Sequence, residues 1–270
     1  MAAIETGGET GVKEAPSAAV TRLTIRKCES LEEMQAAFAL QKEVWKFTDA
    51  ELVPIRIFVL ASKIGGHVIG AFDRNEMVSF ALAIPGNRNA HSFLYSHMLA
   101  VRQQYRNVGL GRRMKLFQRD DAIARGFELM EWTFDPLEIK NAYLNLEKLG
   151  AIARRYNTNQ YGITTSPLQG GLPSDRLVAE WWLKSRRVEK VLGEGHRPDF
   201  AIEARIEVPA EIYDWKAAVA TRPQALAVQQ NNRERLMKAF SKGLSVLGYE
   251  REQNGDGRFL LGHWDEPWRY

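Results

Sequence analysis

The sequence predicts an α+β protein in which short strands and amphipathic helices follow one another along a single chain. Short runs of alternating apolar and polar residues, the pattern of a half-buried strand, recur from Arg22 onward. Longer stretches between them carry apolar residues every three or four positions, as on one face of a helix. With 270 residues, 45% hydrophobic and 26% charged, the chain suits one large domain, or a domain of usual size with an appendage.

The N-terminal part is expected to contain a disordered tail, a strand and two helices. Residues 1–20 are rich in Gly, Ala, Glu, Thr and Ser and lack an apolar period. An alternating run at 22–26 predicts the first strand. Ser30 followed by Glu33 is the pattern of a capping box and predicts a helix start, and Pro54 predicts a second start. The residues expected to face inward from these helices are Met34, Phe38, Leu40, Val44, Ile55, Phe58, Val59 and Ile64.

The middle of the chain alternates further strands and helices. Strands are expected at 67–72, 77–84, 92–101, 129–134, 151–156 and 177–183. Helices are expected at 109–125, 137–149 and 185–192. The inward side of the first of these helices would carry Leu110, Met114, Phe117 and Ala124. Polar loops are expected at 86–90 and 164–175, and the adjacent Trp181 and Trp182 must point to opposite faces of their strand.

Residues 193–270 are expected to form an α/β appendage to a domain of residues 21–192. Its elements would be a linker at 193–198, a strand at 202–208, a helix at 222–242 and a hairpin of 244–250 with 259–263. The segment Asn254-Gly255-Asp256-Gly257 supplies the hairpin turn. We expect a role in specificity or dimerisation, because the basic residues here lack the interleaved aromatic residues of a single-strand nucleic-acid module.

Charge and cysteine content narrow the class of protein. The net charge of +4 is mild and by itself does not indicate nucleic acid as a partner. The single cysteine, Cys28, excludes an intramolecular disulfide and is expected to be buried packing. No apolar run is long enough to span a bilayer, and no basic segment followed by an apolar one marks a secretory signal. The expected location is therefore the cytoplasm.

The segment from Met98 to Arg113 is the one most informative about function. A strand is expected to end near Val101, followed by a basic turn, by Gly109 and Gly111, and then by a helix. Glycines let a ligand approach the backbone, while the first N–H groups of a helix are unpaired and lie at its positive end. The nearby basic residues are Arg102, Arg106, Arg112, Arg113, Lys115 and Arg119. Together these features predict an anion site suited to a pyrophosphate.

Two other glycine-loop sites fit poorly. A dinucleotide-binding fingerprint requires a third glycine, but Met114 stands at that position. A Walker loop requires Gly-Lys followed by Ser or Thr, which the sequence lacks. A nucleotide-binding protein of another fold that uses the same glycines stays open as the weakest hypothesis.

The motif Arg106-x-x-Gly109-x-Gly111 resembles the Arg/Gln-x-x-Gly-x-Gly/Ala motif of the GNAT acyltransferase superfamily. Val101 lies at the matching distance before it, and the order of elements from 21 to 183 agrees. The resemblance implies a central, mostly antiparallel twisted sheet flanked by helices, and acetyl-CoA or another acyl-CoA as donor, with no metal. It also implies that the strand residues contact pantetheine and that the loop wraps the pyrophosphate. The implied CoA contacts are Leu99, Ala100, Val101, Arg106, Asn107, Val108, Gly109, Leu110, Gly111 and Arg112.

The match is imperfect on the helix at 137–149. Many family members carry a tyrosine there that protonates the leaving thiolate, and alignment on Gly150 places Leu146 at that position. A leucine has no proton to give. Asn145, one helical turn after Asn141, is a candidate contact to the CoA arm or its phosphates, or else part of an exposed polar face.

The candidate general base is His97, with Tyr95 beside it. An amine must lose a proton to attack a thioester, and histidine titrates in a suitable range. His97 shares strand parity with Leu99 and Val101, so we expect one common face. Tyr95 could bind substrate or orient a water, while Glu131 is a weaker candidate base that we expect at the surface or in a salt bridge. Aromatic residues that line an acceptor pocket or belong to the core are Trp45, Trp132, Trp181 and Trp182.

Two functions follow from the resemblance. The first is transfer of an acyl group from acyl-CoA to a small-molecule or peptide amine by direct attack. The second is a sensor or scaffold with the same fold that holds acyl-CoA without turnover. Neither involves nucleic acid or a membrane, and a homodimer is left open.

Overall fold

A single ten-stranded sheet runs through the computed structural model, which describes residues 22–166 and 169–268. The strands follow the order β1-β2-β3-β4-β5-β7-β6-β9-β10-β8. Only β4 and β5 pair in parallel, and the other neighbours are antiparallel. The strands are β1 Thr24–Lys27, β2 His67–Asp73, β3 Glu76–Arg88, β4 His91–Val101, β5 Leu129–Phe134, β6 Ile152–Asn157, β7 Arg176–Trp182, β8 Ala204–Val208, β9 Leu244–Arg251 and β10 Gly257–His263. The expected α+β class with a mostly antiparallel sheet is confirmed, and the tail expected at 1–20 lies outside the described residues.

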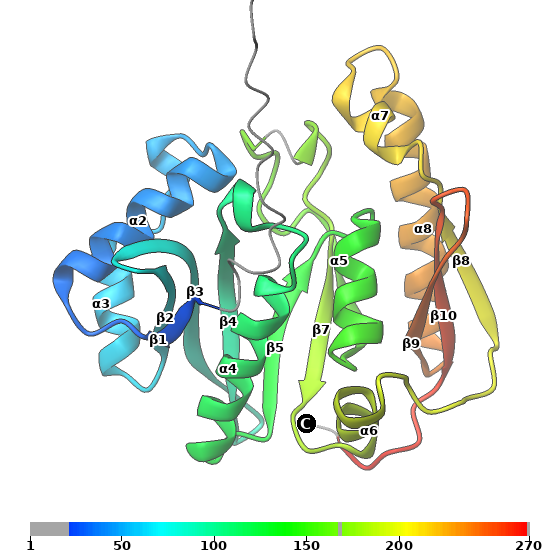
Figure 1. Cartoon of the computed structure of the whole chain (residues 1–270). Coiled ribbons are helices and arrows are strands. Elements are labelled where there is room, and N and C mark those ends of the chain that lie inside the picture. Colours follow the sequence, from blue (N-terminus) through cyan, green and yellow to red (C-terminus); the bar gives the residue numbers. More distant parts are fainter. Residues whose placement is uncertain (1–21, 167–168, 269–270) are drawn as a thin grey trace, which may run out of the picture.

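Helices cover both faces of this sheet (Figure 1). They are α2 Leu31–Trp45, α3 Ile55–Lys63, α4 Leu110–Ala124, α5 Ile139–Tyr143, α6 Arg186–Glu194, α7 Ile212–Ala217 and α8 Arg222–Ser241. Helices α2 and α3 pack on one face of β2 and β3, while α4 packs on the other face. Ser30 and Glu33 form the expected capping box at α2, and Pro54 precedes α3 as expected.

The structure corrects four expectations about local structure. Residues 86–90 are not a polar loop, because β3 and β4 continue to Arg88 and from His91, joined by a tight turn with positive φ at Asn89 and Ala90. The expected helix at 137–149 is divided into α5 and a π-helical segment, Leu144–Lys148. Ile64 and Ala124 are exposed rather than inward. The short helix α7 was not predicted.

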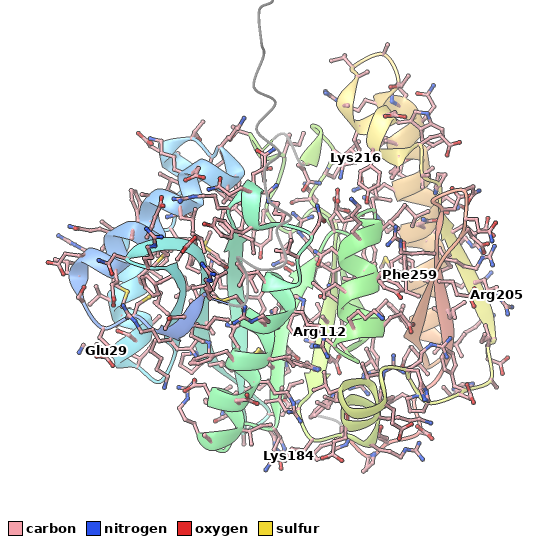
Figure 2. The ribbon with its side chains drawn as sticks, in the orientation of Figure 1. Glu29, Arg112, Lys184, Arg205, Lys216 and Phe259 are labelled. Atoms are coloured by element: carbon pink, nitrogen blue, oxygen red, sulfur yellow. The ribbon has the colours of Figure 1, made fainter. Side chains whose placement is uncertain are left out.

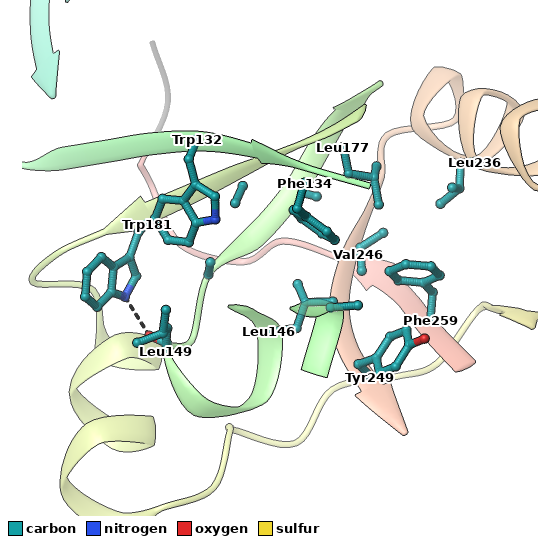
Figure 3. Close-up of a cluster of buried hydrophobic side chains, with 14 of the residues drawn as sticks. Trp132, Phe134, Leu146, Leu149, Leu177, Trp181, Leu236, Val246, Tyr249 and Phe259 are labelled. Atoms are coloured by element: carbon teal, nitrogen blue, oxygen red, sulfur yellow. Dashed lines mark hydrogen bonds between the residues drawn. The ribbon is translucent and has the colours of Figure 1, made fainter. Parts of the chain in front are cut away.

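The C-terminal residues share the sheet and the core of the preceding part. Strand β9 lies beside β6, with Ala153 opposite Val246. The largest buried cluster contains Leu146 and Trp181 together with Tyr249 and Phe259. Figure 3 shows Leu146 directed toward Val246, Phe259 and Tyr249. Trp182 lies on the opposite face, in a second cluster with Trp264, as the strand pattern predicted.

Candidate functional site

Strands β4 and β5 stop pairing near the middle of the sheet, and we call the unpaired stretch beyond their last residue pair the opening. The two strands pair only at Leu94 with Met130 and at Tyr95 with Glu131. Beyond these pairs, β4 continues to Val101 and β5 to Phe134 without pairing to each other, and Figure 1 shows the two strands separating. Unpaired strand edges expose N–H and C=O groups that an extended ligand can use.

A β-bulge at His97 sets which side chains face which side of the opening. Leu82 lies opposite Met98 and Ala83 opposite Ser96, so His97 has no partner across β3. Its ring lies 6.2 Å from the ring of Tyr95, on the face away from α4. Leu99 and Val101 instead pack toward α4. The expected common face of His97 with Leu99 and Val101 is therefore wrong, because the inserted residue shifts the alternation.

The three strand residues expected to contact pantetheine do not all direct their backbone groups to the same side. The Ala100 carbonyl oxygen accepts a hydrogen bond from Ser79 Oγ at 2.6 Å, so it faces β3. In an antiparallel ladder the neighbouring residues direct their backbone groups the other way. Leu99 and Val101 therefore direct theirs toward the opening. The Val101 carbonyl oxygen accepts from Arg106 Nε at 2.9 Å.

The loop before α4 has the backbone conformation that its glycine suggested. Asn107 has φ 62° and Gly109 has φ 84°, both in the left-handed region. Gly109 is the N-cap of α4, and no side chain caps this helix end. A Cβ placed at Gly109 would meet nothing within 4 Å, and one at Gly111 would meet only Leu99, at 3.9 Å. The start of α4 therefore has open space beside Gly109 and Gly111, as an anion site requires.

The basic patch around this loop is smaller than the sequence suggested. Arg102 pairs with Glu43 and Glu76, away from the helix start. Arg119 donates to the Leu183 carbonyl oxygen, and Lys115 is buried. The remaining basic residues near the loop are Arg106, Arg112 and Arg113. Arg112, marked in Figure 2, donates from Nε to the Lys148 carbonyl oxygen at 3.2 Å and thereby ties the start of α4 to the π-helical segment.

Two loops meet on the other side of the opening, near Tyr95. The Tyr95 hydroxyl lies 3.5 Å from Thr133 Oγ1. Tyr161, in the loop between β6 and β7, also neighbours Tyr95, and burial raises the pKa of Tyr95 to about 12. Glu51, between α2 and α3, accepts a hydrogen bond from the Thr165 backbone N–H at 3.0 Å. Segments far apart in sequence, the β6–β7 loop and the connection between α2 and α3, are therefore in contact with each other here.

A charged cluster that sequence reasoning missed lies beside Tyr95. Glu131 accepts two hydrogen bonds from Arg88, at 2.8 and 2.9 Å, and also contacts Arg155. Arg155 Nε lies 3.2 Å from Glu180 Oε1. Of the two roles expected for Glu131, the salt bridge is confirmed and the surface position is wrong, since its side chain is only 2% exposed. The two arginines were not predicted, since they come from β3 and β6 and only the sheet brings them together.

His97 and Asn145 differ in how available their side chains are. Burial lowers the pKa of His97 below its ordinary value, which keeps the ring neutral at neutral pH and able to accept a proton. Asn145 is buried, and its amide accepts from Trp132 Nε1 at 3.3 Å and donates to Asn141 at 3.4 Å. Both ends of the Asn145 side chain are thus used within the protein. Leu146 is fully buried and does not reach the opening.

Other features of the described residues lie elsewhere or are absent. A cavity of about 530 Å³ is lined by Lys27, Lys63, His67, Arg125 and their neighbours, and it contains none of the expected site residues. Within residues 22–166 and 169–268, no group of His, Cys, Asp and Glu side chains is arranged to hold a metal ion. No helix in the same ranges has the length and apolar character needed to cross a bilayer.

Comparison with known proteins finds matches among solved structures but none by sequence. Neither a family model nor a curated protein sequence matches the chain. Among solved structures, the ribosomal-protein-S18-alanine N-acetyltransferase from Escherichia coli has 18% identity over 60% of this chain and 95% of its own, with a TM-score of 0.48. A GNAT-family acetyltransferase from Desulfovibrio desulfuricans has 15% identity over 60% and 99%, with a TM-score of 0.49. The NatC complex bound to Gag peptide and CoA has 16% identity over 59% and 97%, with a TM-score of 0.45.

The order and directions of the strands allow the observed fold to be compared with the expected one. From β1 to β7 the sheet is antiparallel except for one parallel pair, β4–β5, which separates after two residue pairs. The uncapped helix α4 begins at Gly109, directly after β4 and its turn. In its sheet and its glycine-bounded helix, the chain has the mixed, mostly antiparallel arrangement that the resemblance to the GNAT superfamily implied.

Proposed function

We propose that this protein is an acyl-CoA-dependent N-acyltransferase, in which an amine acceptor attacks the donor thioester directly. The observation that carries the proposal is the unpaired end of β4, which leads straight to the uncapped N-terminus of α4. A donor with an amide-containing arm and a pyrophosphate needs these two features in this order.

On the donor side, each part of acyl-CoA has a chemically suitable neighbour. The backbone groups of Leu99 and Val101 can pair with the amides of pantetheine, as another strand would. The first N–H groups of α4 can bind the pyrophosphate, assisted by the half-exposed Arg112 and Arg113. Arg106, exposed and hydrogen-bonded to Val101, would have to move or share that carbonyl when the donor binds.

On the acceptor side, His97 and Tyr95 lie together on the face away from α4. We assign His97 the removal of the proton from the attacking nitrogen, because burial keeps its ring neutral. Tyr95 keeps its hydroxyl proton at all physiological pH values, since its pKa is raised to about 12. It therefore suits hydrogen bonding to the acceptor or a water.

Leu146 supports a second candidate function, a protein that binds acyl-CoA without turning it over. The position at which related enzymes often carry a proton-donating tyrosine is here a leucine within the core. Release of free CoA separates the two functions. A sensor would bind acyl-CoA and release none when amines are added, whereas an enzyme would release it in step with acylation of the acceptor.

Gly109 and Gly126 offer a matched pair of variants to test the donor site. Gly109 has φ 84° and Gly126 has φ 83°, and at both positions a Cβ would meet nothing within 4 Å. Gly109→Ala and Gly126→Ala should therefore cost similar stability, about 1 kcal/mol each. Only Gly109→Ala should weaken binding of acetyl-CoA and longer acyl-CoAs in isothermal titration, by about tenfold or more. Equal affinity of the two variants, or no binding of any CoA species by the wild type, would refute the proposed donor site.

A further inference from the structure

A cavity of about 530 Å³ lies among α2, α3 and the ends of β1, β2 and α4. Its volume falls within the range of sites that bind small molecules. Arg125, which follows the last residue of α4, belongs to its lining, whereas Gly109 caps the other end of that helix. Helix α4 has 15 residues, so its two ends are about 22 Å apart. The cavity is therefore separate from the proposed donor site.

Part of the lining of this cavity is apolar. Met34 from α2 and Val59 from α3 contribute to it. Leu31, in the first turn of α2, also lines the cavity and is 54% exposed. A single exposed leucine needs no explanation, but this one borders a hollow with other apolar side chains. The apolar part of a ligand would remove these side chains from water, and that burial would favour binding.

The lining also carries an excess of positive charge. Three cationic side chains line the cavity, those of Lys27, Lys63 and Arg125. Glu29, labelled in Figure 2, is the only acidic residue among the described residues that line it. Burial lowers the pKa of His67, so its ring is neutral at neutral pH and adds no charge. Lys63 is exposed and pairs with no carboxylate in the described part of the chain, which leaves it available to a ligand.

A carboxylate next to the lining holds two of these cations in place. Asp121, whose side chain is 8% exposed, forms ion pairs with Lys27 and, at 2.7 Å, with Arg125. The Nδ1 atom of the buried His67 lies 2.7 Å from Asp121 Oδ2. Arg125 also donates to the Gly65 carbonyl oxygen at 2.6 Å. Even with Asp121 counted, one positive charge stays in excess, on side chains that are already ordered before a ligand binds.

We propose that this cavity binds a small organic anion, a carboxylate or phosphate group that carries a short apolar body. The anionic group would accept charged hydrogen bonds from Lys27, Lys63 and Arg125. The apolar body would lie against Leu31 and Val59. The proposal does not depend on acyl transfer, since it uses no residue of the opening or of the loop before α4.

Three probes with the same six-carbon chain test the requirement for an anion. Hexanoate and hexyl phosphate carry the two headgroups, and hexanol carries no charge. NMR titration of the full chain should show saturable shifts at the backbone amides of Leu31, Gly65 and Gly66, which line the cavity. The anion that binds more tightly identifies the headgroup, and hexanol should bind at least about tenfold more weakly than that anion. The amides of Gly109 and Gly111 report separately on binding at the start of α4.

Two matched pairs of variants connect binding to the cavity. Ser62→Phe places an aromatic ring in the lining and should abolish the shifts, whereas Ser241→Phe should not. The two serines are comparable, because each is exposed near the end of a helix and donates to the carbonyl oxygen three residues before it, at 2.8 and 2.9 Å. Lys63→Met should weaken binding of the tighter anion by about tenfold. Lys184→Met, at an exposed lysine marked in Figure 2, should leave it unchanged.

The outcomes of this test are independent of the proposed function. The cavity would be excluded as an anion site by a lack of shifts with both anions, by equal affinity for hexanol, or by shifts confined to Gly109 and Gly111. Equal affinities of Ser62→Phe and Ser241→Phe would exclude it as well. Each of these results leaves the binding of acyl-CoA untouched. Conversely, a wild-type protein that binds no CoA species but binds hexanoate or hexyl phosphate in the cavity would refute the donor site and support this proposal.

Discussion

Arg233 of α8 holds Asp175 at the end of the β6–β7 loop through two hydrogen bonds, 2.7 Å from Nε to Oδ2 and 3.0 Å from Nη2 to Oδ1. Asp175 is fully buried and also accepts from the Tyr156 hydroxyl and the Asn159 backbone N–H. The same loop carries Tyr161 to the side of Tyr95. A C-terminal helix thus anchors the loop that carries Tyr161 beside the proposed acceptor side.

Arg233→Met should destabilise the protein by about 3 kcal/mol, because it leaves the buried Asp175 carboxylate without its cation. Urea unfolding followed by tryptophan fluorescence would measure this change. Lys238→Met, at an exposed lysine on the same helix, is the control and should change stability by less than about 0.5 kcal/mol. Equal stabilities for the two variants would show that the ion pair contributes nothing.

His97→Gln should lower kcat/KM by about 100-fold or more while sparing acyl-CoA affinity. Burial lowers the pKa of His97 below 6.5, so the wild-type kcat/KM should fall only at pH values below that, as the ring becomes protonated and can no longer accept a proton. The exposed His196 provides the control variant, His196→Gln. A pH profile of kcat/KM that is the same for His97→Gln and the wild type would exclude His97 as the base.

Local patterns in the sequence predicted most elements, because they depend on neighbouring residues. Ser30 with Glu33 marked a helix start, and the glycine-rich turn at 254–257 marked a hairpin. Gly109 likewise marked the left-handed residue before α4. Each of these signals acts within a few residues, so it does not depend on how distant parts of the chain pack.

Features that depend on distant parts of the chain were not predictable. The bulge at His97 requires knowing the register of β3 against β4, and it reversed the expected face of His97. Lys115 was counted among the basic residues of the predicted anion site, because no local pattern indicates that α4 buries it against Trp132. The Glu131 cluster draws Arg88 and Arg155 from two other strands.

The C-terminal residues should not be separable from the rest. The main cluster joins Leu146 and Trp181 to Tyr249 and Phe259, and β9 lies beside β6. A chain that ends at residue 192 would expose this apolar surface and should be insoluble when expressed. The full chain should unfold in one transition, with coincident curves by circular dichroism and tryptophan fluorescence. Two separate transitions would instead indicate an independently folded C-terminal unit.

Restoring a tyrosine at position 146 should not restore a proton donor. Leu146 is fully buried among Val246, Tyr249 and Phe259, so a larger side chain there overpacks the core and brings a hydroxyl without a designed partner (Figure 3). Leu146→Tyr should therefore cost about 1–3 kcal/mol without raising kcat. Leu146→Met, which conserves volume, should cost less than about 1.5 kcal/mol. Thermal unfolding and CoA release would measure both variants. A more active Leu146→Tyr of unchanged stability would mean that residue 146 reaches the opening.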